Sequence, residues 1–541
     1  MKSHAVPRIT RCAARRIAVG VLALSLTLTA CGGGSTAAAG DPAEGAGTPV
    51  DGGTLVIAEG ATAPHLNPYP ERAAPGMATL QFLSLMYEPL LAKDDTGDVV
   101  AGGTSLSESL EQQDPTTVVV KIRPGVRFHS GAEMTAEDVA FTYTHATDPA
   151  IGSPVGQSRL SSLASAVATD AATVTFTLKR PDSGFLPALA SDQLPVIERK
   201  WTEEHGGDLN TYPNGTGAFK FGSFTPNDSF RAERFEDYWD PALPHLDAVE
   251  VKTMADVATR VAAVRTGEAD IVEFPWDQGR LIDTLDGVTV ASTPPILGEP
   301  FFVSCKNAPL EDIRVRQALM HSLDVNAIKA QVGQGMELPP SYVVPPDFPR
   351  WGVPVGAENP YPRQDTAKAR SLLAEAGHPD GVTIDVEILQ SPTFDYNKRT
   401  VELAAQQAAT AGIHLNVVPV DLATGLAHLA DGSQIASQMG MPVNDDPSAY
   451  WVSFSPLAPS GCTDSHIQDL IAQEKAALDD DTRAGLIKDI VVYAQEQAFL
   501  PMLYARPARL TVIRDGVENY TPVAAIRWNS ARETWKSEEA R

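Results

Sequence analysis

The side chains that most often carry out enzyme chemistry are present, but their spacing matches no familiar catalytic or metal-binding pattern. The sequence contains no G-x-S-x-G, S-x-x-K or H-E-x-x-H motif, and no GxxxxGK followed by Ser or Thr. Its 11 histidines are scattered, and pairs such as His414 and His428 lack the close spacing of zinc ligands. We therefore predict no catalytic residue, no metal site and no cofactor.

The residue with the clearest chemical role is Cys31. It ends the run Leu28-Thr-Ala-Cys31, which resembles the bacterial lipobox, where the thiol is acylated and the chain is cut just before the cysteine. A basic stretch and a short apolar run precede it, so we predict a lipoprotein signal peptide at 1–30. Residues 31–51 contain almost no bulky apolar side chain, which predicts a flexible tether. The pair Arg15-Arg16 leaves both Sec and twin-arginine export open.

Two further cysteines remain in the mature chain after Cys12 leaves with the signal peptide. Cys305 and Cys462 would then sit in an oxidising compartment, where disulfides persist. A disulfide and two isolated buried thiols are both compatible with the sequence, which cannot give the separation of the two residues.

Composition and charge indicate a soluble-type globular protein of several folding units. A chain of 541 residues with 43% apolar residues exceeds what one hydrophobic core usually organises. The 42 Lys and Arg against 68 Asp and Glu give a net charge of -26. The electrostatic field of so negative a protein repels phosphate backbones, so nucleic acid is a poor partner.

Hydrophobic patterns predict sheet-rich structure in the first half and α/β structure between about 300 and 500. Strands are expected at 54–58, 118–123 and 173–179, with a helix that begins at the capping box of Thr135. We also expect one helix from Asp312 to Gly333.

The second half also contains a predicted βαβ unit. A helix is expected over 365–376, and alternation at 382–388, a helix at 398–411 and a strand at 413–418 follow it. The two strands of this unit should be parallel with a right-handed crossover.

Six segments in order resemble the family-5 solute-binding proteins of ABC importers, the peptide- and nickel-binding family of bacteria. The strongest, Lys121 to Ala140, nearly keeps the family's L-R-x-G-V-x-F-H-D-G pattern, with Ser130 where Asp is common. The other five are 85–91, 97–110, 214–220, 314–319 and 365–377. The resemblance implies that the protein is not an enzyme.

The resemblance implies an α/β fold of the type II periplasmic-binding-protein class, with two lobes around a hinge and an extra domain in the first lobe. Lobe I would comprise 52–86, 214–297 and 500–541, with the extra domain at 87–213, and lobe II would comprise 298–499. The chain would cross between lobes near Pro300 and Pro501.

In this family a solute binds between the lobes, favours the closed form and is delivered to the permease subunits of the importer. The resemblance thus implies a peptide or other small solute as ligand, an ABC permease as partner and a lipid-anchored monomer on the outer face of the cell membrane. The solute's identity stays open.

The resemblance also suggests ligand contacts. Asn444, Asp445 and Asp446 lie where the family often has an acidic loop facing the ligand amine, ahead of Trp451; the alternative is a solvated turn. Phe394 stands where the dipeptide branch has a carboxylate-binding arginine, two residues before Tyr396.

That departure favours an oligopeptide over a dipeptide. Trp276 and Phe301 are candidates for an apolar wall, with core packing as the alternative. Other functions compatible with the sequence are binding of a nickel chelate or glycoside, a sensor or chaperone lipoprotein, and, least favoured, an extracytoplasmic hydrolase.

Overall fold

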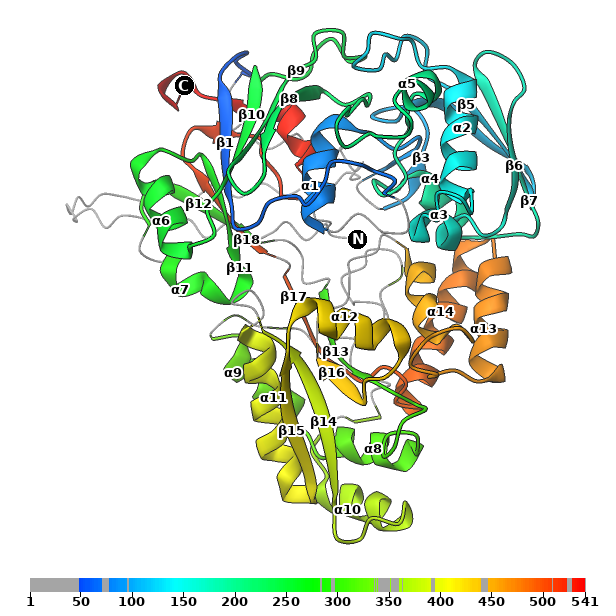
Figure 1. Ribbon diagram of the computed structural model, residues 1–541, viewed down its shortest axis with the longest axis vertical. Helices are drawn as coiled ribbons and strands as arrows, with labels where there is room; N and C mark the ends of the chain where they lie inside the picture. The colour runs from blue at the N-terminus through cyan, green and yellow to red at the C-terminus, as the bar shows by residue number, and fades with distance from the viewer. Residues whose placement is uncertain are drawn as a thin grey trace, which may run out of the picture.

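The computed structural model describes most of the chain beyond the predicted tether. The described residues are 48–70, 77–94, 97–282, 285–292, 297–334, 336, 338, 351, 360–361, 363–390, 395–438, 446–507, 509–522 and 528–540. Three large sheets with flanking helices form the body of the molecule (Figure 1). The predicted signal peptide and Cys31 lie outside the described residues. No helix in the described part is both long and apolar enough to cross a membrane.

A seven-stranded mixed sheet organises the first lobe. Its order is β12-β18-β11-β1-β10-β9-β8, and β1 runs parallel to both β10 and β11. The strands are β1 (Thr54–Glu59), β8 (Phe219–Thr225), β9 (Ser229–Arg234), β10 (Ala248–Thr253), β11 (Ile271–Pro275), β12 (Val288–Ser292) and β18 (Arg509–Arg514). Helices α1 (Met77–Met86) and α6 (Val257–Thr266) pack against it. The strand predicted at 54–58 is β1.

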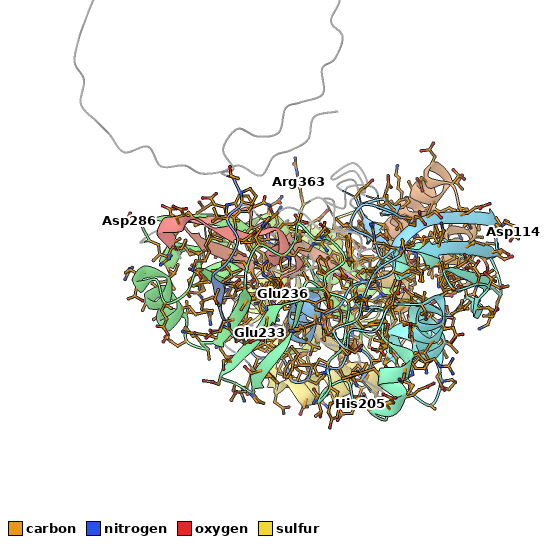
Figure 2. All side chains as sticks on the ribbon, turned by 90° about the horizontal axis from the view of Figure 1, so that it is seen from above. Asp114, His205, Glu233, Glu236, Asp286 and Arg363 are labelled. Carbon is orange, nitrogen blue, oxygen red and sulfur yellow. A yellow bond between two sulfur atoms is a disulfide. The ribbon has the colours of Figure 1, made fainter. Side chains whose placement is uncertain are left out.

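The outer strands alternate between core and solvent. In β9, Phe230 and Ala232 are buried whereas Glu233 is exposed, as expected for a strand with one face in water. Asp114, Glu233 and Asp286 are all exposed, and Figure 2 shows Asp114 and Asp286 at opposite edges of the molecule. Many of the acidic residues behind the net charge of -26 therefore keep their hydration.

A four-stranded antiparallel sheet, in the order β4-β5-β7-β6, forms the extra domain. Its strands are β4 (Ser107–Asp114), β5 (Thr117–Ile122), β6 (Leu163–Ala168) and β7 (Thr173–Leu178), and its helices are α2 (Ala136–Thr147), α3 (Pro154–Arg159), α4 (Phe185–Leu189) and α5 (Arg199–Glu204). The predicted capping box is present: the Thr135 hydroxyl accepts from the Asp138 N–H, and the Asp138 carboxylate accepts from the Thr135 N–H.

A five-stranded sheet, in the order β15-β14-β16-β13-β17, organises the second lobe. Its strands are β13 (Leu297–Val303), β14 (Val382–Leu389), β15 (Ile413–Val420), β16 (Ala436–Gln438) and β17 (Met502–Arg506). The predicted βαβ unit is confirmed, because β14 and β15 are parallel and α11 (Asp395–Ala408) connects them. Gly412 adopts a left-handed φ of 87° that ends the helical segment, a conformation that favours glycine.

The remaining helices surround this sheet. They are α8 (Ile313–His321), α9 (Val325–Val332), α10 (Thr366–Glu375), α12 (Leu422–Asp431), α13 (Ser465–Ala476) and α14 (Asp480–Glu496). The prediction of a single helix from Asp312 to Gly333 was wrong, because this segment forms the two helices α8 and α9. Asp324 caps a new helix by accepting from the Ala327 N–H, which separates α9 from α8.

The predicted crossings near Pro300 and Pro501 fall at two strands, β13 and β17, that pair with each other. We assigned 500–541 to lobe I, but β17 pairs antiparallel with β13 in the five-stranded sheet. Pro300 sits at a bulge in β13, where a proline is tolerated, and the Phe301 N–H donates to the Pro501 carbonyl. β12 and β18 thus belong to the seven-stranded sheet, whereas β13 and β17 belong to the five-stranded sheet.

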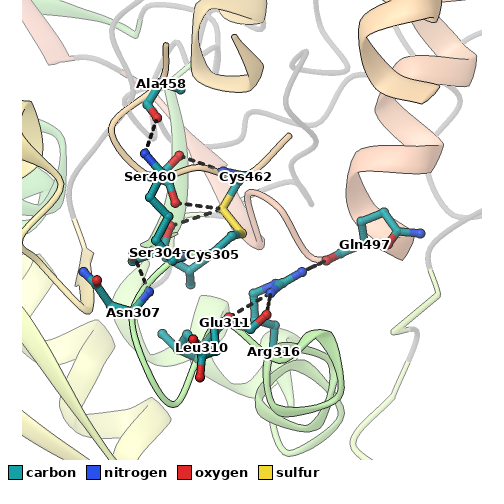
Figure 3. Close-up of a disulfide and its surroundings, with 12 residues drawn as sticks. Ser304, Cys305, Asn307, Leu310, Glu311, Arg316, Ala458, Ser460, Cys462 and Gln497 are labelled. Carbon is teal, nitrogen blue, oxygen red and sulfur yellow. Dashed lines mark hydrogen bonds between the residues drawn. A yellow bond between two sulfur atoms is a disulfide. The ribbon is translucent and has the colours of Figure 1, made fainter. Parts of the chain in front are cut away.

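Cys305 and Cys462 form a disulfide in this lobe. The bridge joins the residues after β13 to the segment before α13, and the Cys305 N–H donates to the Ser460 carbonyl at 2.8 Å beside it (Figure 3). It connects residues 157 positions apart. The alternative of two isolated thiols does not apply to the structure.

Candidate functional site

Six buried side chains meet where the chain crosses between the two large sheets. Trp276 belongs to the first lobe, because it begins the 3-10 turn η1 (Trp276–Gln278) directly after β11. The others come from β13, α11, β16 and β17 of the second lobe. We call this set the crossing cluster: Trp276, Glu299, Tyr396, Asn397, Gln438 and Arg506.

A buried ion pair lies at the centre of the crossing cluster. Arg506 Nε donates to Glu299 Oε1 at 2.5 Å, and Gln438 Nε2 donates to the other carboxylate oxygen at 2.7 Å. Arg506 Nη2 also donates to the Tyr396 hydroxyl. Burial raises the pKa of Glu299, and the Arg506 guanidinium acts against that rise. The only charges of the crossing cluster thus neutralise each other.

Aromatic rings cover this ion pair. The Trp276 and Tyr396 rings meet edge to face with centroids 5.4 Å apart, and the Arg506 guanidinium lies 4.6 Å from the Tyr396 centroid. Next to Trp276, Asp277 of the first lobe forms an ion pair with Arg399 of α11 at 3.1 Å. The two lobes are therefore linked here by both apolar and charged contacts.

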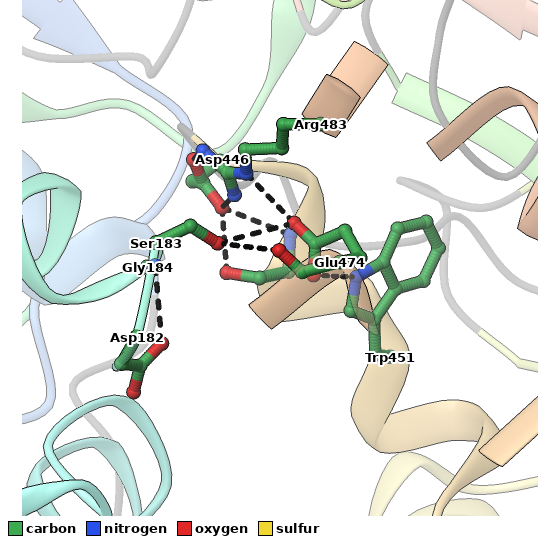
Figure 4. A network of polar contacts seen from close by, with 8 residues as sticks. Asp182, Ser183, Gly184, Asp446, Trp451, Glu474 and Arg483 are labelled. Carbon is green, nitrogen blue, oxygen red and sulfur yellow. Dashed lines mark hydrogen bonds and ion pairs between the residues drawn. The ribbon is translucent and has the colours of Figure 1, made fainter. Parts of the chain in front are cut away.

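A second buried network lies where the extra domain meets the second lobe (Figure 4). Arg483 of α14 donates to both oxygens of Asp446, at 2.9 and 2.6 Å, and to Glu474 Oε1 at 2.8 Å. The Trp451 indole N–H donates to Glu474 Oε2 at 2.9 Å. We call this set, Asp446, Trp451, Glu474 and Arg483, the Arg483 cluster.

The extra domain reaches this cluster through one short segment. The Ser183 N–H donates to the Lys475 carbonyl at 2.8 Å, and its hydroxyl donates to the Glu474 carbonyl at 3.1 Å. A Cβ on Gly184 would stand 2.6 Å from the Ser448 hydroxyl of η4 (Pro447–Phe454). A larger residue at position 184 would therefore require the Ser448 hydroxyl to shift.

Asp446 does not lie in a solvated turn, which was one of the two roles considered for it. Its side chain is buried, with 5% of the residue exposed, and it also accepts from the Ser448 N–H as the N-cap of η4. Burial acts to raise its pKa, but the Arg483 guanidinium holds that pKa below its usual value. Its charge is satisfied by the protein, which argues against a ligand amine as its partner.

The other ligand-binding predictions fall into two groups. Phe301, Tyr396 and Trp451 are buried within the second-lobe core, and Tyr396 and Trp451 also hydrogen-bond to protein groups. Trp276 is equally buried, but within the part of the chain that the structure describes its indole N–H has no hydrogen-bond partner. The remaining three, Phe394, Asn444 and Asp445, lie outside the described residues.

Sequence reasoning missed Glu299, Arg506 and Arg483. The first two carried a signal, because each is a charge in an otherwise apolar strand, Leu297–Val303 and Met502–Arg506. Arg483 carried none, because it lies among charged residues near the start of α14. No group of three or more His, Cys, Asp or Glu in the described part of the chain is arranged to hold a metal ion.

The family model for bacterial extracellular solute-binding proteins, family 5, matches residues 87–460, which is more than half of the chain. The chain belongs to this family. Proteins of the family are solute-binding components of ABC transporters rather than enzymes, and they work outside the cytoplasm.

Individual relatives agree with this assignment. The glutathione-binding protein GsiB of Escherichia coli K12 is 28% identical over 391 residues, which cover 72% of this chain and 73% of GsiB. The family-5 chain also has the fold of DppA from Helicobacter pylori, solved with the peptide STSA, at a TM-score of 0.76 and 22% identity over 90% of this chain and 99% of DppA.

AppA from Bacillus subtilis, solved with a nonapeptide, gives a TM-score of 0.75 at 21% identity, covering 91% of this chain and all of AppA (100%). These neighbours confirm the predicted type II periplasmic-binding-protein fold with two lobes.

Proposed function

We propose that the protein captures a peptide between its two lobes and delivers it to the permease of an ABC importer. The single observation that supports a peptide longer than two residues is the closed Glu299–Arg506 pair. Arg506 is the cation of the crossing cluster, and Glu299 already neutralises it, so it does not offer a site for a terminal carboxylate. The peptides bound by DppA and AppA support the same ligand class.

Binding would act by shifting a population. A ligand that touches Trp276 on one lobe and α11 or β16 on the other binds the closed form better than the open form. The permease then recognises the closed form. For the ligand's ammonium group we keep Asp445 as the candidate, since the carboxylate of Asp446 is engaged with Arg483.

The test is to identify the ligand and then to measure uptake. Native mass spectrometry of gently purified full-length protein should show a co-purified peptide, and calorimetry with synthetic peptides of two to eight residues should give tighter binding above two residues. Deletion of the gene should abolish uptake of the bound peptide. Binding without any loss of uptake would instead indicate a sensor.

We further propose that a lipid on Cys31 holds the protein at the outer face of the membrane. The residues around it, Leu28-Thr-Ala-Cys31, support acylation there. The tether at 31–51 lets the binding lobes search for the permease at a raised local concentration.

Cys31→Ala should therefore remove the protein from the membrane fraction or leave it as an unprocessed precursor. Fractionation and blotting of cells that express the variant provide the measurement, with Cys12→Ala as the matched control that keeps the anchor. A Cys31→Ala protein that is processed normally and stays in the membrane fraction would rule out lipidation at this residue.

A further inference from the structure

Three polar atoms of the crossing cluster are buried and have no hydrogen-bond partner among the described residues. They are the indole Nε1 of Trp276, the side-chain oxygen Oδ1 of Asn397 and the side-chain oxygen Oε1 of Gln438. The three residues are between 0% and 2% exposed. Buried polar groups in folded proteins nearly always have partners, so each such atom indicates a partner outside the described residues, and a bound ligand is one that could reach all three.

The three residues belong to one connected set of contacts. Asn397 Nδ2 donates to the backbone carbonyl of Gln438 at 3.1 Å, and Gln438 Nε2 donates to Glu299 at 2.7 Å. The Arg506 guanidinium, paired with that same Glu299, lies 5.7 Å from the centroid of the Trp276 ring. The one donor from the first lobe and the two acceptors from the second lobe thus belong to residues that are linked, directly or through one neighbour, to a single ion pair.

The charge of this set limits what it can bind. Glu299 and Arg506 neutralise each other, and the pair next to Trp276 in the sequence, Asp277 with Arg399, is also balanced. A charged ligand group brought here would lose its hydration without gaining an opposite charge. The ligand group that matches one donor and two acceptors in a neutral site is therefore an uncharged group that both accepts and donates hydrogen bonds.

We propose that Trp276, Asn397 and Gln438 form a subsite for an uncharged secondary amide of the ligand. The Trp276 indole N–H donates to the amide carbonyl, and the oxygens of Asn397 and Gln438 accept from the amide N–H. The subsite therefore reads an internal peptide bond rather than either charged terminus. This inference rests on the proposed function and specifies which part of the peptide meets the lobe crossing.

Trp276→Phe tests the subsite because it removes the unpartnered N–H and keeps an aromatic ring. The probes are synthetic peptides of two to eight residues that bind the wild-type full-length protein in calorimetry. Affinity should fall about five- to tenfold, the usual effect of one lost neutral hydrogen bond. The Tm of the ligand-free variant should fall only slightly, because the smaller ring loses some packing against Tyr396 but no internal hydrogen bond is lost.

Trp451→Phe is the matched control, since its indole N–H donates to Glu474 inside the protein. This variant should have the lower Tm of the two, because it loses the same amount of ring and also leaves a buried carboxylate oxygen without its donor. Unchanged peptide affinity in Trp276→Phe, or a Tm that falls as far as in Trp451→Phe, would overturn the subsite and leave peptide binding intact. If no peptide binds the wild type, the proposed function itself fails, and the subsite with it.

Discussion

Replacing Arg483 by methionine is expected to lower the free energy of unfolding by about 3–5 kcal/mol at pH 7, because it leaves two buried carboxylates without their cation. Asp446 and Glu474 are both buried, and Arg483 donates to each of them. Methionine keeps part of the side-chain volume but supplies no charge. Denaturant titration of wild type and variant at pH 7 is the measurement.

The free energy of unfolding that Arg483→Met removes should be smaller at pH 5 than at pH 7. In the wild type, Arg483 holds the pKa of the Asp446 carboxyl below its usual value, although burial acts to raise it. The ionised carboxylate therefore stabilises the fold above the pKa of the unfolded chain, and this stabilisation is lost as the pH falls through the lower pKa of the folded protein. In the variant the same burial raises the pKa of both carboxyls, so they bind protons near pH 5 at less cost.

Arg199→Met is the matched control, because Arg199 forms an exposed pair with Glu203 and its removal should cost less than about 1 kcal/mol. If Arg483→Met lowered the free energy of unfolding no more than this control, the Arg483 cluster would not contribute to the stability of the fold.

Removing the disulfide is expected to cost about 5 kcal/mol of stability. A bridge that joins positions 157 apart restricts the unfolded chain strongly, and the chain-entropy relation gives this magnitude for such a loop. The double variant Cys305→Ala, Cys462→Ala should therefore unfold at a lower denaturant concentration than the wild type. The same shift should follow from adding a reductant to the wild type.

The reductant should have no effect on the double variant, which serves as its control. Two thiols that are freely alkylated in the native, unreduced wild type would contradict the bridge.

Local sequence signals predicted much of the fold. The capping box at Thr135 and the left-handed glycine at Gly412 rely on backbone hydrogen bonds and dihedral angles that depend on near neighbours. The alternation in 382–388 likewise reports one face of a buried strand. Such features can be read without knowing the partners of each segment.

Features that depend on distant partners could not be predicted in the same way. β17 looks like a continuation of the lobe I segment in the sequence, and only its pairing with β13 places it in the other sheet. Asp446 sits in an Asp-Pro pair that favours a turn, yet Arg483, 37 residues later, buries it. Ligand contacts depend on such pairings most of all, because they join both lobes.

The contact of Ser183 with Lys475 and Glu474 has a kinetic consequence. It lies between the extra domain and the second lobe, apart from the crossing cluster, so a movement that separates these two parts must break it. A bond that must break before a bound solute leaves slows escape without changing the rate of encounter. The residence time of every solute would then share one contribution from this contact, whereas differences between solutes would arise at the lobe crossing.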